Sequence, residues 1–342
     1  MEFKKYNSIT NTYDEEFIQK IKLQHPNIEK WCITEKIHGS NTCISYNYAE
    51  DTIKYGKRTS FLEEGEACYN VQDCLKPIEK EIRIVHKILT NTFGIAPTDV
   101  VMYGEVCGGS YPHPDVPRDN KATRVQKGVF YNSTNSWVAF DIAYKLSSDD
   151  YYHYVPSKTF NAICETLSIP RVPLLAVVNS IEEALEYPNN QPSVLQKQFN
   201  LPEIPNNIME GVVIKPYEVD VFIGQTRVVL KNKNATFAEK SRAKKPDVQK
   251  ELPENIAKVV AELQTYATEN RVNNILSHYG QMSKAEKIQK LGMLICETNK
   301  EIIEEARKAG VFNTLETKLE VKTATGKLNH IVANLVKKVI LS

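Results

Sequence analysis

The segment Thr34-Glu35-Lys36-Ile37-His38-Gly39-Ser40-Asn41 lies between two β-rich runs, Trp31-Cys32-Ile33 and Thr42-Cys43-Ile44-Ser45-Tyr46. These flanks predict two strands, so Lys36 is expected at a strand-to-loop corner. Gly39 allows either a close backbone approach or a positive φ just beyond the lysine. An amine held beside polar or cationic groups loses its proton more readily and is then a nucleophile. A solvated lysine in a hairpin is the alternative that this segment alone leaves open.

The bulk composition limits the class of protein. A chain of 342 residues predicts two domains, or one large domain with an appendage. Its hydrophobic content of 42% suffices for sizeable cores, and its formal net charge is only +1. Binding of nucleic acid would therefore need a local basic patch. Seven cysteines occur without a Cys-x-x-Cys pair, which argues against a zinc site or a disulfide framework and favours a reducing compartment.

The sequence also bears on location and partners. The N-terminus, Met1-Glu2-Phe3-Lys4-Lys5, lacks the apolar run that follows the charges of a signal peptide. No stretch approaches the ~18 apolar residues of a membrane span, so no membrane partner is expected. We therefore predict a soluble intracellular protein. The cytoplasm is the expected compartment, with the nucleus or an organelle left open, and no feature indicates an obligate protein partner.

Hydrophobic patterning predicts an α+β fold with antiparallel sheets in the first part of the chain. Strands are expected within residues 30–60 and over 99–106, 137–144, 210–215 and 227–233, and helix over most of 64–94. Beyond Leu252, apolar residues recur at helical spacing, and Pro253 suits a first helical turn. We predict a domain of residues 1–245 and a helical C-terminal domain of residues 246–342, with residues 244–247 as the linker.

Six short motifs occur in one order along the first domain. They are Glu35-Lys36-Ile37-His38-Gly39, Lys57-Arg58-Thr59, Tyr103-Gly104-Glu105, Phe140-Asp141-Ile142, Glu210-Gly211-Val212-Val213-Ile214-Lys215 and Val229-Leu230-Lys231-Asn232-Lys233. This order and spacing resemble the covalent nucleotidyltransferases, which include polynucleotide ligases and mRNA capping enzymes. Each motif alone is weak evidence for this superfamily, whereas the ordered set is specific for it. The resemblance implies an adenylyltransferase domain in the first part of the chain.

The histidine at position 38 narrows the resemblance. DNA ligases and capping enzymes usually carry aspartate before this glycine, whereas Lys36-Ile37-His38-Gly39 followed by Ser40-Asn41 is similar to the RNA ligase 2 family of ATP-dependent RNA ligases. Further similar stretches are Phe3-Lys4-Lys5-Tyr6, residues 234–240 and residues 270–274. The resemblance covers nearly the whole chain and is thinner after about residue 280.

The chemistry of ligation accounts for several of these residues. A lysine activates the reaction by attacking the α-phosphate of ATP; AMP then passes to the RNA 5′-phosphate, and the 3′-hydroxyl displaces it. Lys36 must be neutral to attack, and Lys231 and Lys233 supply like charge that favours loss of its proton. They also stabilise negative charge on the α-phosphate. Glu210 supplies a carboxylate to hold Mg²⁺ (or Mn²⁺) against the phosphates. A solvated strand face is the alternative for these residues.

The resemblance implies further contacts with the nucleotide. Glu105 resembles the residue that binds the ribose, and Arg58 resembles another sugar or phosphate contact. Phe140 resembles the aromatic ring that stacks on adenine, with Val213 on the opposite side. An ordinary place in the core is the alternative for both apolar residues.

Four other polar residues receive roles in the same way. Asp141 and Glu35 resemble structural and nucleotide-proximal acids. His38 resembles the group that orients pyrophosphate in the first step, with a satisfied loop histidine as the alternative. Asn41 resembles a ligand of the phosphate in the nucleic-acid steps.

A basic tract follows the last motif. Residues 231–250 contain seven basic and two acidic side chains within a chain of net charge +1. Such clustering suits the phosphate backbone, so Lys240, Arg242 and Lys244 are expected RNA contacts, together with Arg271 of the helical region. A solvated linker is the alternative.

The sequence thus predicts an ATP-dependent, magnesium-requiring RNA ligase that acts on 3′-hydroxyl and 5′-phosphate ends, with a nicked duplex as the expected substrate. An ATP-dependent DNA ligase is one alternative, but it normally follows the last lysine motif with a β-rich oligonucleotide-binding barrel. A non-catalytic RNA-binding protein that retains the fold is the other. An intact set of Lys36, Glu210, Lys231 and Lys233 argues against it.

Overall fold

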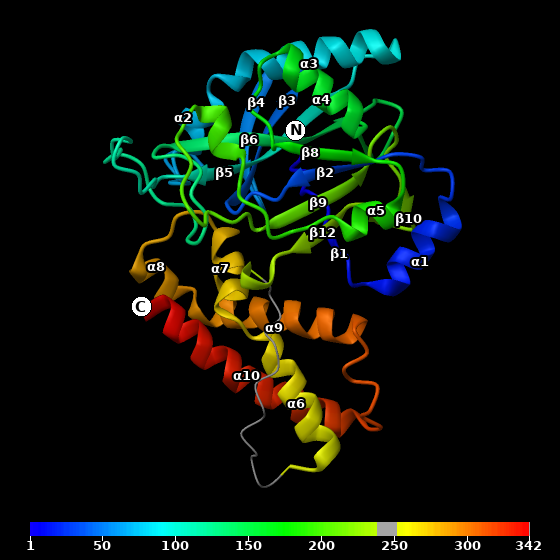
Figure 1. Ribbon diagram of the computed structural model, residues 1–342, viewed down its shortest axis with the longest axis vertical. Helices are drawn as coiled ribbons and strands as arrows, with labels where there is room; N and C mark the ends of the chain where they lie inside the picture. The colour runs from blue at the N-terminus through cyan, green and yellow to red at the C-terminus, as the bar shows by residue number, and fades with distance from the viewer. Residues whose placement is uncertain (238–251, 342) are drawn as a thin grey trace. The chain divides into compact units, whose positions relative to one another are not determined.

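The computed structural model describes residues 1–237 and 252–341 (Figure 1). The chain divides into two compact units, Met1–Asn234 and Ala235–Ser342. This division precedes the expected boundary between residues 245 and 246. The expected linker, residues 244–247, lies outside the described residues, as do Lys240, Arg242 and Lys244. The RNA contacts expected for those three side chains therefore stay predictions.

Five strands form the first sheet of the N-terminal unit, in the order β1-β12-β9-β2-β8. They are Thr10–Asn11 (β1), Leu230–Lys233 (β12), Gly211–Pro216 (β9), Trp31–Glu35 (β2) and Leu174–Val178 (β8). β2 pairs antiparallel with β8 and β9, and β9 pairs antiparallel with β12, whereas β1 pairs with β12 in parallel. The sheet therefore sets the strand before Lys36 beside the strand after Glu210.

A second five-stranded sheet, in the order β4-β3-β5-β6-β7, is antiparallel throughout. Its strands are Thr52–Lys57 (β4), Ser40–Asn47 (β3), Asp99–Gly108 (β5), Asn135–Lys145 (β6) and Tyr152–Tyr154 (β7). Phe222–Ile223 (β10) and Thr226–Arg227 (β11) form a separate hairpin. The expected strand over 227–233 is thus divided, because Arg227 ends β11 and β12 begins at Leu230.

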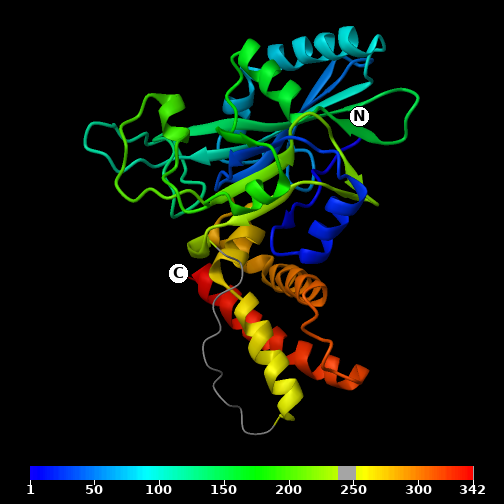
Figure 2. The ribbon, with the colours of Figure 1, turned by 45° about the vertical axis from the view of Figure 1, so that its right-hand side comes forward.

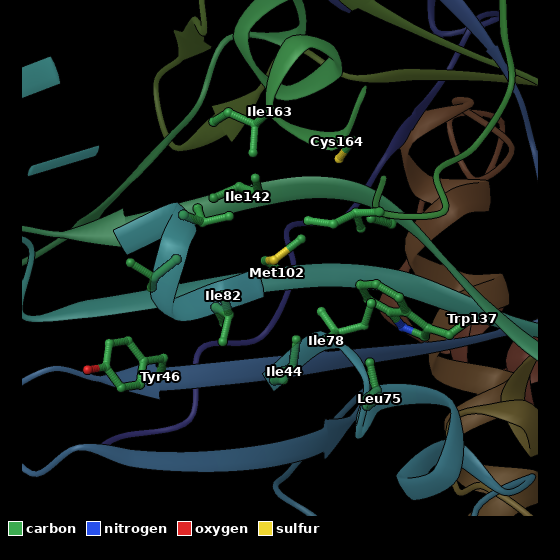
Figure 3. Packing of buried hydrophobic residues seen from close by; sticks show 14 of the residues in the cluster. Ile44, Tyr46, Leu75, Ile78, Ile82, Met102, Trp137, Ile142, Ile163 and Cys164 are labelled. Atoms are coloured by element: carbon green, nitrogen blue, oxygen red, sulfur yellow. The ribbon is translucent and has the colours of Figure 1, made fainter. Parts of the chain in front are cut away.

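Helices cover one face of each sheet. Those of the N-terminal unit are Glu15–Gln24 (α1), Val71–Leu75 (α2), Ile78–Phe93 (α3), Ser157–Thr166 (α4) and Ile181–Glu186 (α5). α2, α3 and α4 pack on the second sheet, where Leu75 and Ile82 join Met102 and Trp137 in one core (Figure 3). α1 and α5 cover the first sheet (Figure 1). The face of the second sheet that α3 leaves uncovered is therefore available to other segments.

The N-terminal segment covers part of that other face. The ring centroid of Tyr6 lies 4.9 Å from those of Tyr103 and Phe140, and 6.0 Å from that of Tyr154. The Tyr103 hydroxyl also donates a hydrogen bond to the Lys4 carbonyl oxygen at 2.8 Å. The segment thereby fills the middle of the face and leaves its polar end for the candidate site.

The second unit is helical, as predicted. Its helices are Glu254–Tyr266 (α6), Glu269–Ser277 (α7), Lys284–Gln289 (α8), Leu291–Lys308 (α9) and Lys318–Leu341 (α10). α6 and α10 lie side by side in both views (Figures 1 and 2), and their Leu263, Leu328 and Val332 are buried in one core with Ile302 of α9. Within the described residues, no helix combines the length and the apolarity needed to cross a bilayer.

Candidate active site

Lys36 and Glu210 meet where β2 ends and β9 begins. The two strands are antiparallel with Glu35 opposite Val212, which brings the residues just beyond them together. The Lys36 Nζ atom lies 2.8 Å from Oε2 of Glu210, and the Lys36 backbone nitrogen donates to the Gly211 oxygen at 2.9 Å. The Glu210 side chain is 3% exposed and that of Lys36 is 19% exposed. The candidate nucleophile therefore touches the candidate metal ligand and remains accessible.

Two further motif residues converge on the same carboxylate. The Lys233 Nζ atom lies 3.0 Å from Oε1 of Glu210, and the His38 Nδ1 atom lies 3.5 Å from Oε2. Burial would raise the pKa of Glu210, but Lys36, Lys233 and His38 together hold that pKa well below its usual range. Glu210 is therefore ionised at neutral pH, and three separate motifs form one charged cluster around it.

Glycines at two positions allow the backbones of this cluster to approach. A Cβ atom on Gly39 would lie 2.2 Å from the Val106 carbonyl oxygen, so the close approach, and not a positive φ, requires glycine there. Gly211 has a φ of +151°, and its added Cβ would lie 2.2 Å from the Asn232 oxygen. Any larger residue at either position would move the lysine corner.

Tyr131 supports the loop after Lys36 and was missed by the sequence analysis. Its buried hydroxyl accepts a hydrogen bond from the His38 backbone nitrogen at 2.8 Å. The backbone of the preceding Phe130 is held by the Asn207 side chain. Asn207 accepts a hydrogen bond from the Phe130 nitrogen at 2.8 Å and donates one to the Phe130 carbonyl oxygen at 2.7 Å. Because Tyr131 and His38 are 93 residues apart, no local pattern indicates this contact.

Glu35 is buried beneath the lysine corner. Its Oε1 accepts a hydrogen bond from the Ser193 hydroxyl at 2.6 Å, and its Oε2 accepts one from the Val194 nitrogen at 2.9 Å. Burial raises the pKa of Glu35 to about 7, although these donors oppose the change. Glu35 thus ties residues 193–194, which directly precede the 3-10 helix Leu195–Phe199, to the end of β2. Its expected proximity to the nucleotide stays a prediction.

The second sheet contributes a polar group at the same end. Asn41 on β3 and Glu105 on β5 are register partners, and Arg58 directly follows β4. Burial raises the pKa of Glu105 to about 7; Lys36 and Arg58 oppose the change and Glu210 adds to it. These mutual effects place Glu105 in the electrostatic environment of the lysine cluster. The ribose, sugar and phosphate roles of Glu105, Arg58 and Asn41 stay predictions.

Phe140 and Val213, the expected neighbours of the adenine ring, lie on β6 and β9, in different sheets. Both are only partly buried. Val213 is the register partner of Lys231, and the ring of Phe140 packs edge-on against Tyr6 at 4.9 Å. Their partial exposure is compatible with stacking on a base, which stays a prediction.

Asp141 is the centre of a buried ionic network. It accepts hydrogen bonds from the Tyr6 hydroxyl at 2.7 Å, from Arg227 Nη1 at 2.7 Å and from Lys215 Nζ at 3.1 Å. Burial would raise the pKa of Asp141, but Arg227 and Lys215 hold it below its usual value. Lys215 also donates to the Phe140 oxygen at 2.8 Å. Asp141 therefore joins the two sheets and supports Phe140, which favours the structural role over direct nucleotide contact.

Arg271 lies inside the helical unit. Its side chain is buried, its Nη2 atom lies 2.7 Å from Oε2 of Glu305, and its Nε atom donates to the Tyr266 oxygen at 3.0 Å. Arg271 thus ties α7 to α9 and to the end of α6. An RNA contact was expected here, but a guanidinium enclosed by protein partners is not presented to a phosphate.

The donor set at Glu210 bears on a metal ion. Across residues 1–237 and 252–341, no group of three His, Cys, Asp or Glu side chains forms a metal site. Mg²⁺, however, commonly binds one or two carboxylates and completes its coordination with substrate phosphates and water. The ionised carboxylate of Glu210, next to an accessible lysine, fits that mode of binding.

Comparison with known families agrees with this arrangement. The RNA ligase family model matches residues 29–233, and the T4 RNA ligase 2 C-terminal model matches residues 249–334. The chain belongs to the RNA ligase family.

Individual relatives are more distant. RNA-editing ligase 2, mitochondrial, of Trypanosoma brucei brucei is 28% identical over 162 residues, which are 44% of this chain and 39% of the relative. RNA-editing ligase 1, mitochondrial, of the same organism is 25% identical over 260 residues, 68% of this chain and 54% of the relative. The chain thus spans about half the length, or less, of these relatives. Two structures of Naegleria gruberi RNA ligase variants, one with AMP and Mn and one with ATP and Mn, each give a TM-score of 0.44, with 15% and 16% identity, over 69% of this chain and 57% of theirs.

Proposed function

We propose that the chain is an ATP-dependent RNA ligase that joins a 5′-phosphate to a 3′-hydroxyl through lysyl-AMP and RNA-adenylate intermediates. The observation that carries the proposal is the cluster of Lys36, Lys233 and His38 around the buried carboxylate of Glu210. A lone surface lysine would need no such surroundings. Membership of the RNA ligase family supports the same conclusion.

In the first step, the neutral Lys36 amine attacks the α-phosphate of ATP, a nitrogen–phosphorus bond forms, and pyrophosphate leaves. Glu210, which accepts from Lys36 at 2.8 Å, holds the amine at the corner of the site. Lys231 and Lys233 stabilise charge on the α-phosphate. His38, two residues after the nucleophile, orients the leaving pyrophosphate.

Glu210 is the residue that would hold Mg²⁺ or Mn²⁺, which neutralises phosphate charge when bound. Glu105 would bind the ribose and Arg58 the sugar or a phosphate, and Phe140 and Val213 would enclose the adenine. ATP or AMP and Mn are named for the Naegleria structures, which makes ATP and a divalent ion the first choices for assay.

In the later steps, AMP passes from Lys36 to the RNA 5′-phosphate, and the 3′-hydroxyl then attacks that phosphate and releases AMP. Asn41, Lys240, Arg242 and Lys244 would contact the RNA phosphates, and a nicked duplex is the proposed substrate. The cytoplasmic location stays a prediction, since the trypanosome relatives carry the word mitochondrial in their names.

Two alternatives are less well supported. A DNA ligase normally has a β-rich barrel after the last lysine motif, whereas the described residues of the second unit are helical. A non-catalytic RNA-binding protein has no need for a lysine paired with a buried carboxylate. The RNA ligase is therefore the function that we propose.

The decisive experiment is transfer of label from ATP to the protein. Wild type, incubated with Mg²⁺ and ATP labelled at the α-phosphate, should carry acid-labile label after denaturation. Lys36→Ala should carry none because it lacks the amine. Lys36→Arg should carry none because its guanidinium stays protonated and cannot attack. Lys20→Ala, which removes a half-exposed lysine of α1, should label normally. Label on Lys36→Ala would place the nucleophile elsewhere.

Substrate choice is a second measurement. Nicked duplexes with ribose or deoxyribose on each side of the break should be sealed only when the 3′-hydroxyl strand ends in ribose. Equal sealing of all-DNA nicks would favour the DNA ligase instead.

A further inference from the structure

A cavity of about 890 Å³ lies at the β7 edge of the second sheet. Lys4, Asn7, Phe93, Tyr144, Tyr151 and His153 are among its lining residues. Lys36, His38, Glu210 and Lys233 are not, so this cavity is separate from the lysine cluster. The β7 strand bounds the cavity at one side, and the loop before β10 bounds it at another.

A ladder of rings forms one wall. The rings of Phe93 and Tyr144 stack with centroids 4.8 Å apart and planes 23° apart. Tyr144 and His153 continue the stack at 5.2 Å and 19°, whereas the ring of Tyr151, 4.7 Å from that of His153, is tilted by 52°. Near-parallel rings at these separations present a π-face to a further planar group.

The outer rings are exposed to solvent. Tyr151 is 64% exposed, Phe93 is 40% exposed and Phe222, another lining residue, is 37% exposed. Three aromatic rings around one cavity form an apolar surface that gains free energy when a flat apolar group covers it. The ligand that suits the cavity is therefore planar and aromatic.

The charges at the cavity are balanced. Asp220 lies 2.6 Å from Arg227 Nε, and Glu218 lies 2.8 Å from Lys158 Nζ. Lys4 is a wall residue with its Nζ atom 5.6 Å from the centre of the Tyr152 ring. The acids are paired with cations, so an incoming phosphate meets Lys4 without a dominant negative field.

Amide groups supply hydrogen bonds for a base edge. Asn7 Oδ1 accepts from the Tyr154 hydroxyl at 2.6 Å, and the nitrogen of this amide is a hydrogen-bond donor. Gln225, another wall residue, is exposed. Amides of this kind pair with the polar edges of nucleobases.

We propose that this cavity binds an unpaired nucleobase of the RNA strand, outside the site of ligation. The base stacks on Tyr151 and the ring ladder, and its backbone phosphate lies toward Lys4. Single-stranded RNA is bound in this way because every base offers a π-face, whereas bases within a duplex do not. The inference rests on the RNA substrate of the proposed function. A proline-rich peptide, which also docks on aromatic grooves, is the competing occupant.

Binding of a fluorescent oligoadenylate without a 5′-phosphate, in the absence of ATP, tests the proposal on the full-length protein. Tyr151→Ala and Phe93→Ala should each weaken binding about 5-fold or more, and Tyr151→Trp should restore it. Tyr48→Ala, which removes a 55% exposed tyrosine outside the cavity, should have no effect. An abasic oligomer of the same charge should bind wild type and Tyr151→Ala equally.

Crosslinking locates the base without any substitution. An oligomer with 5-iodouridine should crosslink, on irradiation, to the peptide that contains Tyr151 and His153. Crosslinks confined to other peptides, oligoadenylate affinity unchanged in Tyr151→Ala, or equal losses with the abasic oligomer would each overturn the proposal. A proline-rich peptide that binds wild type but not Tyr151→Ala, with RNA binding unaffected, would replace it.

The two proposals fail separately. Tyr151→Ala should form lysyl-AMP at the wild-type rate, because the cavity is outside the lysine site. Wild type that binds oligoadenylate through the cavity but takes no label from ATP would disprove the ligase and keep the RNA site.

Discussion

The Nζ atoms of Lys36 and Lys233 bind different oxygens of one carboxylate, at 2.8 and 3.0 Å from Glu210. The two lysines are far apart in the sequence. Lys36 directly follows β2 and Lys233 ends β12, and these two strands flank β9 in the sheet. Each lysine thus helps to keep the common carboxylate ionised, and the carboxylate holds the two positive charges close together. The loss of any one of the three therefore changes the environment of the other two.

Loss of either strand lysine should disable the first step. Lys233→Ala and Lys231→Ala should each slow lysyl-AMP formation by two orders of magnitude or more, if each cation stabilises the transition state by about 3 kcal/mol. Single-turnover labelling with ATP measures the rates. Lys54→Ala, at an exposed lysine of β4, is the matched control. Near-normal rates in the first two variants would show that these lysines are only a strand surface.

His38→Ala should separate the steps of the reaction. In the wild type, the His38 Nδ1 atom lies 3.5 Å from Oε2 of Glu210, which is the oxygen that Lys36 also contacts. We expect a larger loss in lysyl-AMP formation than in sealing of a strand that is already adenylylated, because only the first step releases pyrophosphate. The two rates are measured on the same preparation. Equal losses would contradict the assignment to pyrophosphate.

Tyr131→Phe should loosen the lysine loop without removing any group from the reaction. The change removes the acceptor of the His38 backbone hydrogen bond, and a buried donor left unpaired costs about 1–3 kcal/mol. We expect slower lysyl-AMP formation with a little-changed KM for ATP. Tyr111→Phe removes a hydroxyl that donates to the Pro202 oxygen and serves as the control. A rate loss shared by both variants would indicate general destabilisation only.

Glu35 should make stability depend on pH. Burial raises its pKa from an ordinary value of 4.5 to about 7, so the folded state binds more protons than the unfolded state in this interval. Its stabilising contribution is therefore complete below pH 4.5 and is lost as the pH rises to about 7, a change of about 3 kcal/mol.

Urea unfolding of wild type and Glu35→Gln between pH 5 and pH 8 measures this contribution. Wild type should lose more free energy of unfolding across the range than the variant. Glu105, whose pKa is also about 7, is present in both proteins and its effect largely cancels. Parallel pH profiles would show that Glu35 does not titrate in this range.

A fragment of residues 1–246 should form lysyl-AMP but not seal a nick. The residues proposed to bind the nucleotide and the metal ion all lie within the unit Met1–Asn234. The helical unit is left for the RNA steps, so the fragment should bind RNA more weakly than the full-length chain. Sealing by the fragment at the full-length rate would contradict this division of roles.

The sequence predicted the parts of the site that lie in contiguous motifs. Lys36, Glu210 and Lys233 stand out because the ordered set of motifs resembles a known family, and the strands and the helical region were predicted from periodicity. Tyr131 could not be found in this way, because a buried tyrosine that accepts one backbone hydrogen bond looks like any core tyrosine. Arg271 was misread for a related reason: a buried ion pair with Glu305 depends on packing between helices, which local composition does not record.

The order of strands in the first sheet has a consequence during synthesis. β1 (Thr10–Asn11) pairs with β12 (Leu230–Lys233), and β2 pairs with β9. Strands that are synthesised early therefore cannot form these pairs until the later strands have been synthesised. Loop closure over such separations is slow, and the unpaired edges of the early strands stay open to other chains. On the ribosome, a nascent chain therefore carries Lys36 long before Glu210 and Lys233 emerge from the exit tunnel. The proposed attack on ATP therefore cannot begin until nearly the whole first unit has been released.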